Sequence, residues 1–231
     1  AATAVQPLAQ SFDEVVARRV AFLTRYQNAG YAARYEKLVR RVEAAERGTA
    51  GGSKKLAEAV ARSLFKLMAY KDEYEVARLY TDGTFLKRIR AQFDGDYALN
   101  FHLAPPLTAE RDARTGHLKK RTYGPSMLRV FGVLAKLKFL RGTHLDIFGY
   151  NEERRTERRL ITDYERLVEE ILSGLSPANH ATAIALAQIP ERIRGYGHIK
   201  QANLVAAKAS EATLLQQFRS PPASTPAIAA E

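Results

Sequence analysis

One histidine of the sequence lies where it could act as a general base. His102 belongs to the stretch YALNFHL, residues 97–103, and imidazole is the side chain that most often transfers protons near neutral pH. Apolar and polar residues alternate through this stretch, which predicts a β-strand. The sequence assigns no catalytic set, so His102 stands as a candidate catalytic residue beside the alternative of a histidine with a structural or surface role.

A second candidate is an anion-binding site near the end of the chain. The stretch ERIRGYGHIK brings Gly195 and Gly197 directly before an expected helix, with Arg192, Arg194 and Lys200 close by. Free N–H groups at a helix N-terminus, together with cations, can hold a phosphate or a carboxylate. The alternative is a tight turn between helices that requires glycine. A dinucleotide-binding fold is not indicated, because no expected strand precedes the glycines.

Positive charge is concentrated in one segment. The chain of 231 residues has a formal net charge of +11, and residues 111–141 contain nine Lys or Arg but a single acid, Asp112. This segment therefore supplies eight of the eleven excess charges. We expect it to present a basic surface that docks an acidic partner. The candidate docking residues are Arg111, Arg114, Lys119, Lys120 and Arg121.

Two other readings of the basic segment stay open. Edge strands often carry lysine only because charge prevents strand-to-strand aggregation. Nucleic acid is another acidic partner, and such binding would weaken steeply with salt. No nucleic-acid recognition motif appears in the sequence, so this partner is not the one we expect.

The residue types also limit metal and redox chemistry. The chain has no cysteine, which excludes disulfides, thiolate zinc sites and cysteine-held iron–sulfur clusters within it. The five histidines lie far apart in the sequence, so no metal site is expected.

Periodicity predicts a mostly α-helical fold that holds the candidate residues in place. Apolar residues recur at helical spacing, most clearly over residues 151–173, and a small antiparallel β-hairpin or three-stranded sheet is expected near residues 97–123. We expect one helical domain over residues 1–219, a candidate hinge at the glycine-rich stretch 47–53, and a disordered tail over 220–231.

Three local details of these elements can be predicted. Ser11 and Ser53 precede helical patterns and are the expected N-caps. The stretch SMLRVFGVLAKLKFL, which begins at Ser126, is apolar on most sides. This composition predicts a central, buried helix.

Nothing in the sequence predicts a membrane location. The longest apolar stretch is shorter than the ~20 residues of a membrane span. The first residues, AATAVQPLAQSFDEVV, have neither the charged nor the apolar region of a secretory signal. They also lack an initiator Met, which fits an excised or processed chain. We expect a cytoplasmic protein with no membrane partner.

Five stretches together resemble the C-terminal region of fused indolepyruvate ferredoxin oxidoreductases, which belong to the 2-oxoacid:ferredoxin oxidoreductases. They lie in the same order over residues 17–219 and read ARRVAFLTRYQNAGYAARY, VARSLFKLMAYKDEYEVARLY, FHLAPPL, YGPSMLRVF and ERIRGYGHIKQANL. The resemblance implies a C-terminal accessory domain whose catalytic domains lie upstream.

In that family, the full-length enzymes convert arylpyruvates with coenzyme A to acyl-CoA and CO2, and pass electrons to ferredoxin. The resemblance implies thiamine diphosphate, Mg and iron–sulfur clusters for such an enzyme and none of them for this chain, onto which no catalytic residue of the family maps. The implied partners are the catalytic domains and ferredoxin, which is acidic. The isolated chain is then expected to be inactive. The alternatives are a basic nucleic-acid-binding helical module and a stand-alone CoA- or anion-binding domain.

Overall fold

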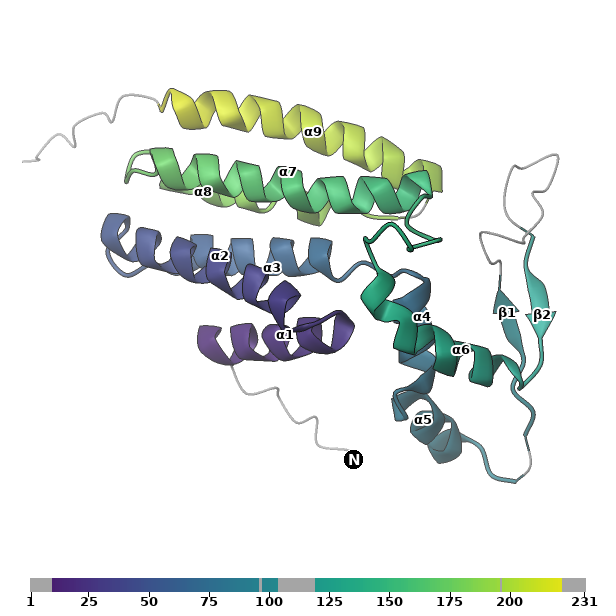
Figure 1. Ribbon diagram of the computed structural model, residues 1–231. Coiled ribbons are helices and arrows are strands. Elements are labelled where there is room, and N and C mark those ends of the chain that lie inside the picture. Colours follow the sequence, from purple (N-terminus) through teal and green to yellow (C-terminus); the bar gives the residue numbers. More distant parts are fainter. Residues whose placement is uncertain (1–9, 96, 104–118, 196, 222–231) are drawn as a thin grey trace, which may run out of the picture. The chain divides into compact units, whose positions relative to one another are not determined.

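The computed structural model describes residues 10–95, 97–103, 119–195 and 197–221. These residues form nine α-helices, two short 3-10 helices and a two-stranded antiparallel sheet (Figure 1). The predicted mostly helical fold with a small antiparallel sheet is confirmed. No helix in this described part is both long and apolar enough to cross a membrane.

The described chain packs into two compact units. Unit 1 contains the residues up to Ala69 and those from Arg158 onward, and unit 2 runs from Tyr70 to Glu157. The glycine-rich stretch 47–53 lies inside unit 1, so the division does not fall there. The extent of the domain and the hinge stay predictions, and the expected disordered tail lies almost wholly outside the described residues.

Unit 1 is built from long helices that pack on their apolar faces. They are α1 (Phe12–Tyr26), α2 (Ala29–Thr49), α3 (Lys55–Met68), α7 (Glu152–Gly174), α8 (His180–Ala187) and α9 (Gly197–Arg219), with the 3-10 helix η2 (Ile189–Arg192) after α8. Helix α7 begins in unit 2 and continues into unit 1. Its buried Tyr164, Leu167 and Ile171 lie at helical spacing, as the sequence predicts.

Ser11 caps α1 as predicted. Its hydroxyl accepts a hydrogen bond from the Glu14 N–H at 3.2 Å, and the Glu14 carboxylate accepts one from the Ser11 N–H at 2.8 Å. This reciprocal pair satisfies two of the N–H groups that a helix start leaves without partners.

The cap of α3 is not the predicted one. Ser53 reaches only the Lys55 N–H, at 3.3 Å, while fully buried Glu46 of α2 accepts hydrogen bonds from the N–H groups of Leu56 and Ala57, both at 2.9 Å. His180 Nε2 of α8 lies 2.8 Å from the same carboxylate. One glutamate therefore joins three helices of unit 1.

Two arginines of α2 also bind α7. Arg34 forms a bidentate ion pair with Glu165, and Arg41 forms a bidentate ion pair with Glu169. Planar guanidinium groups match carboxylates in this geometry. The pairs fix the register of α2 against α7 along one side of unit 1.

Unit 2 is smaller and has an aromatic core. It contains α4 (Glu73–Thr81), α5 (Thr84–Gln92), β1 (Phe101–Leu103), β2 (Arg121–Tyr123), α6 (Met127–Lys136) and the 3-10 helix η1 (Leu137–Leu140). The strands pair in antiparallel register, with Phe101 opposite Tyr123. The rings of Tyr80, Phe101 and Phe131 lie 5.0–5.5 Å apart and join α4, the sheet and α6.

The expected burial of α6 is wrong. Among its residues only Phe131 is buried, while Val130 and Val133 are exposed. The composition of the stretch is apolar on most sides, but the neighbours in unit 2 cover only the face that carries Phe131. An apolar helix is buried only where another element covers it.

Candidate functional site

The basic segment contributes fewer exposed charges than its sequence suggests. Lys119 and Lys120 are exposed beside β2, and Arg121, Arg129 and Lys136 are exposed on β2 and α6. The other two docking candidates, Arg111 and Arg114, lie outside the described residues. Five of the nine cations in the segment are therefore exposed in the part of the chain that the structure describes.

Arg141 is not part of that surface, which corrects its inclusion in the basic segment's free charge. Its side chain is 3% exposed and donates two hydrogen bonds to Asp72, whose side chain is also 3% exposed. The Asp72 carboxylate in addition accepts from the Glu75 N–H at 2.8 Å and so caps α4. Arg141 is a structural residue of unit 2.

A second carboxylate anchors the loop that follows Arg141. Asp146 accepts hydrogen bonds from the Gly142 N–H at 2.8 Å, the Gly149 N–H at 3.0 Å and the Tyr74 hydroxyl at 3.1 Å. Burial, with the nearby Asp146 charge, raises the pKa of Tyr74. The phenol therefore stays protonated and serves as a donor.

The side chain of Lys138, in η1, is only partly exposed. Partial burial lowers its pKa, and repulsion from Arg141 and Arg78 lowers it further. Partial burial therefore disfavours its charged form relative to that of an exposed lysine.

His102 lies on β1 and is exposed. Its Nδ1 is 3.1 Å from the Thr122 hydroxyl, on the residue opposite it in the strand register. No carboxylate in the described residues hydrogen-bonds to this ring. The geometry gives His102 a threonine partner, and its role as a base stays a prediction.

The glycine-rich turn before α9 needs both of its glycines. Gly195 has φ of +92° and Gly197 has φ of +54°, which residues with a side chain rarely adopt. A Cβ at Gly195 would lie 2.8 Å from Ile199 Cγ2. The alternative reading, a tight turn that requires glycine, therefore accounts for these two residues.

The anion-site arginines line an open groove in unit 1. The groove has a volume of about 310 Å³, and its described lining is Ala185, Gln188, Glu191, Arg192 and Arg194. Arg194 Nε donates to the Glu191 backbone oxygen at 2.8 Å, and Arg192 donates to the Ser210 hydroxyl at 3.2 Å. Both guanidinium groups are thus oriented by the fold. Gly195, Gly197 and Lys200 are not in this lining.

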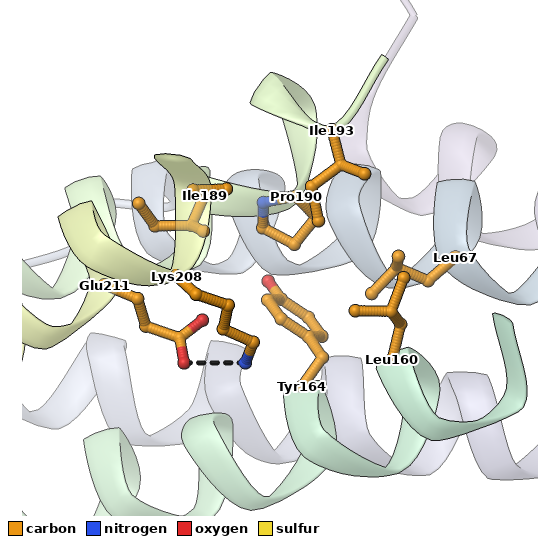
Figure 2. Close-up of a pocket in the computed structure, with 9 residues that line it drawn as sticks. Leu67, Leu160, Tyr164, Ile189, Pro190, Ile193, Lys208 and Glu211 are labelled. Atoms are coloured by element: carbon orange, nitrogen blue, oxygen red, sulfur yellow. Dashed lines mark hydrogen bonds and ion pairs between the residues drawn. The ribbon is translucent and has the colours of Figure 1, made fainter. Parts of the chain in front are cut away.

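A smaller cavity of unit 1 was not expected from the sequence. It has a volume of about 10 Å³, about enough for one water molecule. Figure 2 shows its lining, in which the Tyr164 hydroxyl points toward Pro190. That hydroxyl donates to the Ala187 backbone oxygen at 2.8 Å, and burial raises the pKa of Tyr164. The cavity is a packing detail beside η2.

Lys66 of α3 hydrogen-bonds to the backbone of η2 and of the residue that follows it. Its ammonium donates to the backbone oxygens of Pro190 at 2.7 Å and Ile193 at 2.9 Å. A lysine at helical carbonyls satisfies acceptors that the end of a helix leaves free. Lys66 therefore stabilises the backbone segment that carries Arg192 and Arg194.

Metal-binding geometry is absent from the part of the chain that the structure describes. No group of three or more His, Asp or Glu side chains there could hold a metal ion.

Comparison with known protein families finds a match for this chain. Residues 12–213 match the model described as "Family of unknown function (DUF6537)". The chain belongs to this family. The range matched by the DUF6537 model extends through both units and contains every candidate site residue. No curated protein and no solved structure matches the chain.

Proposed function

We propose that this DUF6537 chain is an accessory interaction domain of an enzyme like the fused indolepyruvate ferredoxin oxidoreductases. The resemblance over residues 17–219 supports the choice of enzyme. In this proposal the upstream catalytic domains carry thiamine diphosphate, Mg and the iron–sulfur clusters, and oxidise arylpyruvates with coenzyme A. The chain itself binds an acidic surface, either on the catalytic domains or on ferredoxin.

The observation that carries the proposal is that five cations of the basic segment are exposed on unit 2. Lys119 and Lys120 stand in solvent beside a strand that is anchored by the aromatic core, and no acid occurs in the sequence between Asp112 and Asp146. A surface of one charge attracts a partner of the opposite charge and speeds their encounter. Arg129 and Lys136 are exposed on helix α6, where protection of a strand edge does not account for them.

Reversing two charges tests the proposal. We expect the Lys119→Glu/Lys120→Glu variant to bind the catalytic domains or ferredoxin about tenfold or more weakly, because exposed unit charges about 4 Å apart interact by about 1 kcal/mol each. Binding is measured by calorimetry at low and at high salt, and salt should weaken the wild type more than the variant.

The matched control is Lys37→Glu/Lys55→Glu, which makes the same change in net charge with two exposed lysines of unit 1. It should bind like the wild type. Equal affinity of the Lys119/Lys120 variant and the wild type for both probes would refute docking through this surface.

The groove in unit 1 favours a second candidate function, the binding of an anionic ligand. Arg192 and Arg194, whose guanidinium groups the fold orients, line one open groove beside Gln188 and Glu191. Arginine suits phosphate and carboxylate groups. Coenzyme A and inorganic phosphate are the probes. We expect Arg194→Gln to weaken binding of either about tenfold, since a charge-assisted hydrogen bond contributes about 1.5–3 kcal/mol.

Thermal shift of the full chain measures this, with titration calorimetry for the affinity. The control variant is Arg166→Gln, whose side chain is 77% exposed on α7 and lies outside the groove lining. If neither probe shifts the wild-type melting temperature, the groove does not bind these anions.

A further inference from the structure

Helix α6 exposes apolar side chains that its own unit leaves uncovered. Val130 is 52% and Val133 is 62% exposed, and a spacing of three residues places them on one face of the helix. Phe131, the buried residue of α6, points into the core with Tyr80 and Phe101. The helix therefore has one face in the core and a second apolar face in solvent.

The apolar exposure continues beyond the helix. The segment that follows α6 exposes four more large apolar side chains, Phe139, Leu145, Ile147 and Tyr150. Single exposed apolar residues are common, whereas neighbouring apolar residues on one exposed face form a patch of the kind that marks interaction sites. Val130 and Val133 are the two of these that a regular helix holds in fixed positions.

Cations flank the two valines. Arg129 and Lys136 are exposed, and their spacing from Val133 is four and three residues, which places them on the same face. We define the α6 strip as Arg129, Val130, Val133 and Lys136. A partner that covers it needs an apolar centre and an acidic rim.

We propose that the α6 strip is the site where a permanently bound protein surface with an apolar centre and an acidic rim docks. This inference rests on the proposed function, in which that surface belongs to the catalytic domains of the enzyme. Electron-transfer partners bind through small interfaces and leave quickly, so an apolar centre suits the catalytic domains and not ferredoxin. A second copy of the chain is disfavoured, because a symmetric pair would oppose identical cations.

The absence of cysteine from the chain makes a direct test simple. A single Val133→Cys variant carries one thiol, and its reaction with a maleimide is followed by the mass of this chain. With the catalytic domains at about ten times their Kd, about a tenth of the chain is free, so the rate should fall about tenfold. The matched control is Val205→Cys on α9, because Val205 is 64% exposed. Its rate should not change.

The second measurement is affinity. The variant Val130→Ser/Val133→Ser should bind the catalytic domains about 10- to 100-fold more weakly, as central apolar residues of interfaces do, and should bind ferredoxin like the wild type. Val205→Ser should leave both affinities unchanged. Melting temperatures of all variants show whether unit 2 stays folded, which is expected because both valines lie in solvent.

The outcomes separate the two proposals. Tight binding by the wild type without protection of the Val133→Cys thiol overturns the α6 strip and leaves the proposed function standing. If the wild type binds neither the catalytic domains nor ferredoxin, both the proposed function and the α6 strip are overturned. The Val133→Cys thiol could also become protected when the concentration of the isolated chain is raised. That result would make the α6 strip a self-association site and would also overturn the inference.

Discussion

Asp72→Ala is expected to lower the free energy of unfolding of unit 2 by about 3–5 kcal/mol, because it leaves the buried Arg141 guanidinium without its counter-charge. The carboxylate is 3% exposed, pairs with Arg141 through two hydrogen bonds and caps α4 through the Glu75 N–H. The Arg141 guanidinium also lies over the Tyr74 ring, 5.6 Å from its centre. Losing the carboxylate therefore disturbs the start of α4 and the loop after η1 together.

Urea unfolding followed by circular dichroism gives the free energy, and hydrogen exchange of the α4 amides places the loss in unit 2. Asp94→Ala removes an exposed carboxylate of the same unit and should change stability by less than about 0.5 kcal/mol. The double variant Asp72→Ala/Arg141→Met should recover part of the loss, since it removes the orphaned charge. An Asp72→Ala chain as stable as the Asp94→Ala chain would show that the pair is not buried.

Glu46→Ala is the second large effect, an expected loss of about 3 kcal/mol in unit 1. The substitution leaves the N–H groups of Leu56 and Ala57 and the His180 ring without their acceptor in a fully buried place. Each buried polar group without a partner costs about 1–3 kcal/mol. Hydrogen exchange at the first turn of α3 should rise first, because that turn loses its cap.

Glu58→Ala is the matched control for Glu46. Glu58 also lies in the first turn of α3, but it is exposed, so its loss should cost about 0.5 kcal/mol or less. A comparable loss in the two variants would mean that negative charge near the helix start matters and the buried hydrogen bonds do not.

Local sequence patterns predicted two features of the long helices correctly. The position of Ser11 before a helical pattern predicts an N-cap, and the spacing of Tyr164, Leu167 and Ile171 predicts the buried face of α7; the structure has both. In both cases the residues that define the pattern lie within a few positions of one another in the sequence. Side chains that meet partners across the fold were predicted less well.

Glu46, Arg141 and α6 show where local reasoning ends. The partners of Glu46 lie in α3 and α8, and the partner of Arg141 is Asp72, 69 residues away in the sequence. No local pattern distinguishes a buried ion-paired side chain from an exposed one. The apolar composition of α6 likewise predicts burial, but only the packing of unit 2 decides which face is covered.

The same distinction between local sequence pattern and tertiary packing applies to the candidate sites. The sequence points to Lys119 and Lys120, and the structure exposes both. It also points to Arg192 and Arg194, which line one groove, but it groups them with a glycine turn that the backbone itself requires. Charge density can be read from a sequence, whereas the burial of Arg141 and the partial burial of Lys138 depend on packing.

The most direct test of docking through unit 2 is hydrogen exchange of the whole chain alone, with the catalytic domains of the enzyme and with ferredoxin. We predict slower exchange of amides in residues 119–139 on binding, with unchanged exchange in the amides of α1 and α9. Protection confined to unit 1, or no protection anywhere at saturating concentration, would contradict the account.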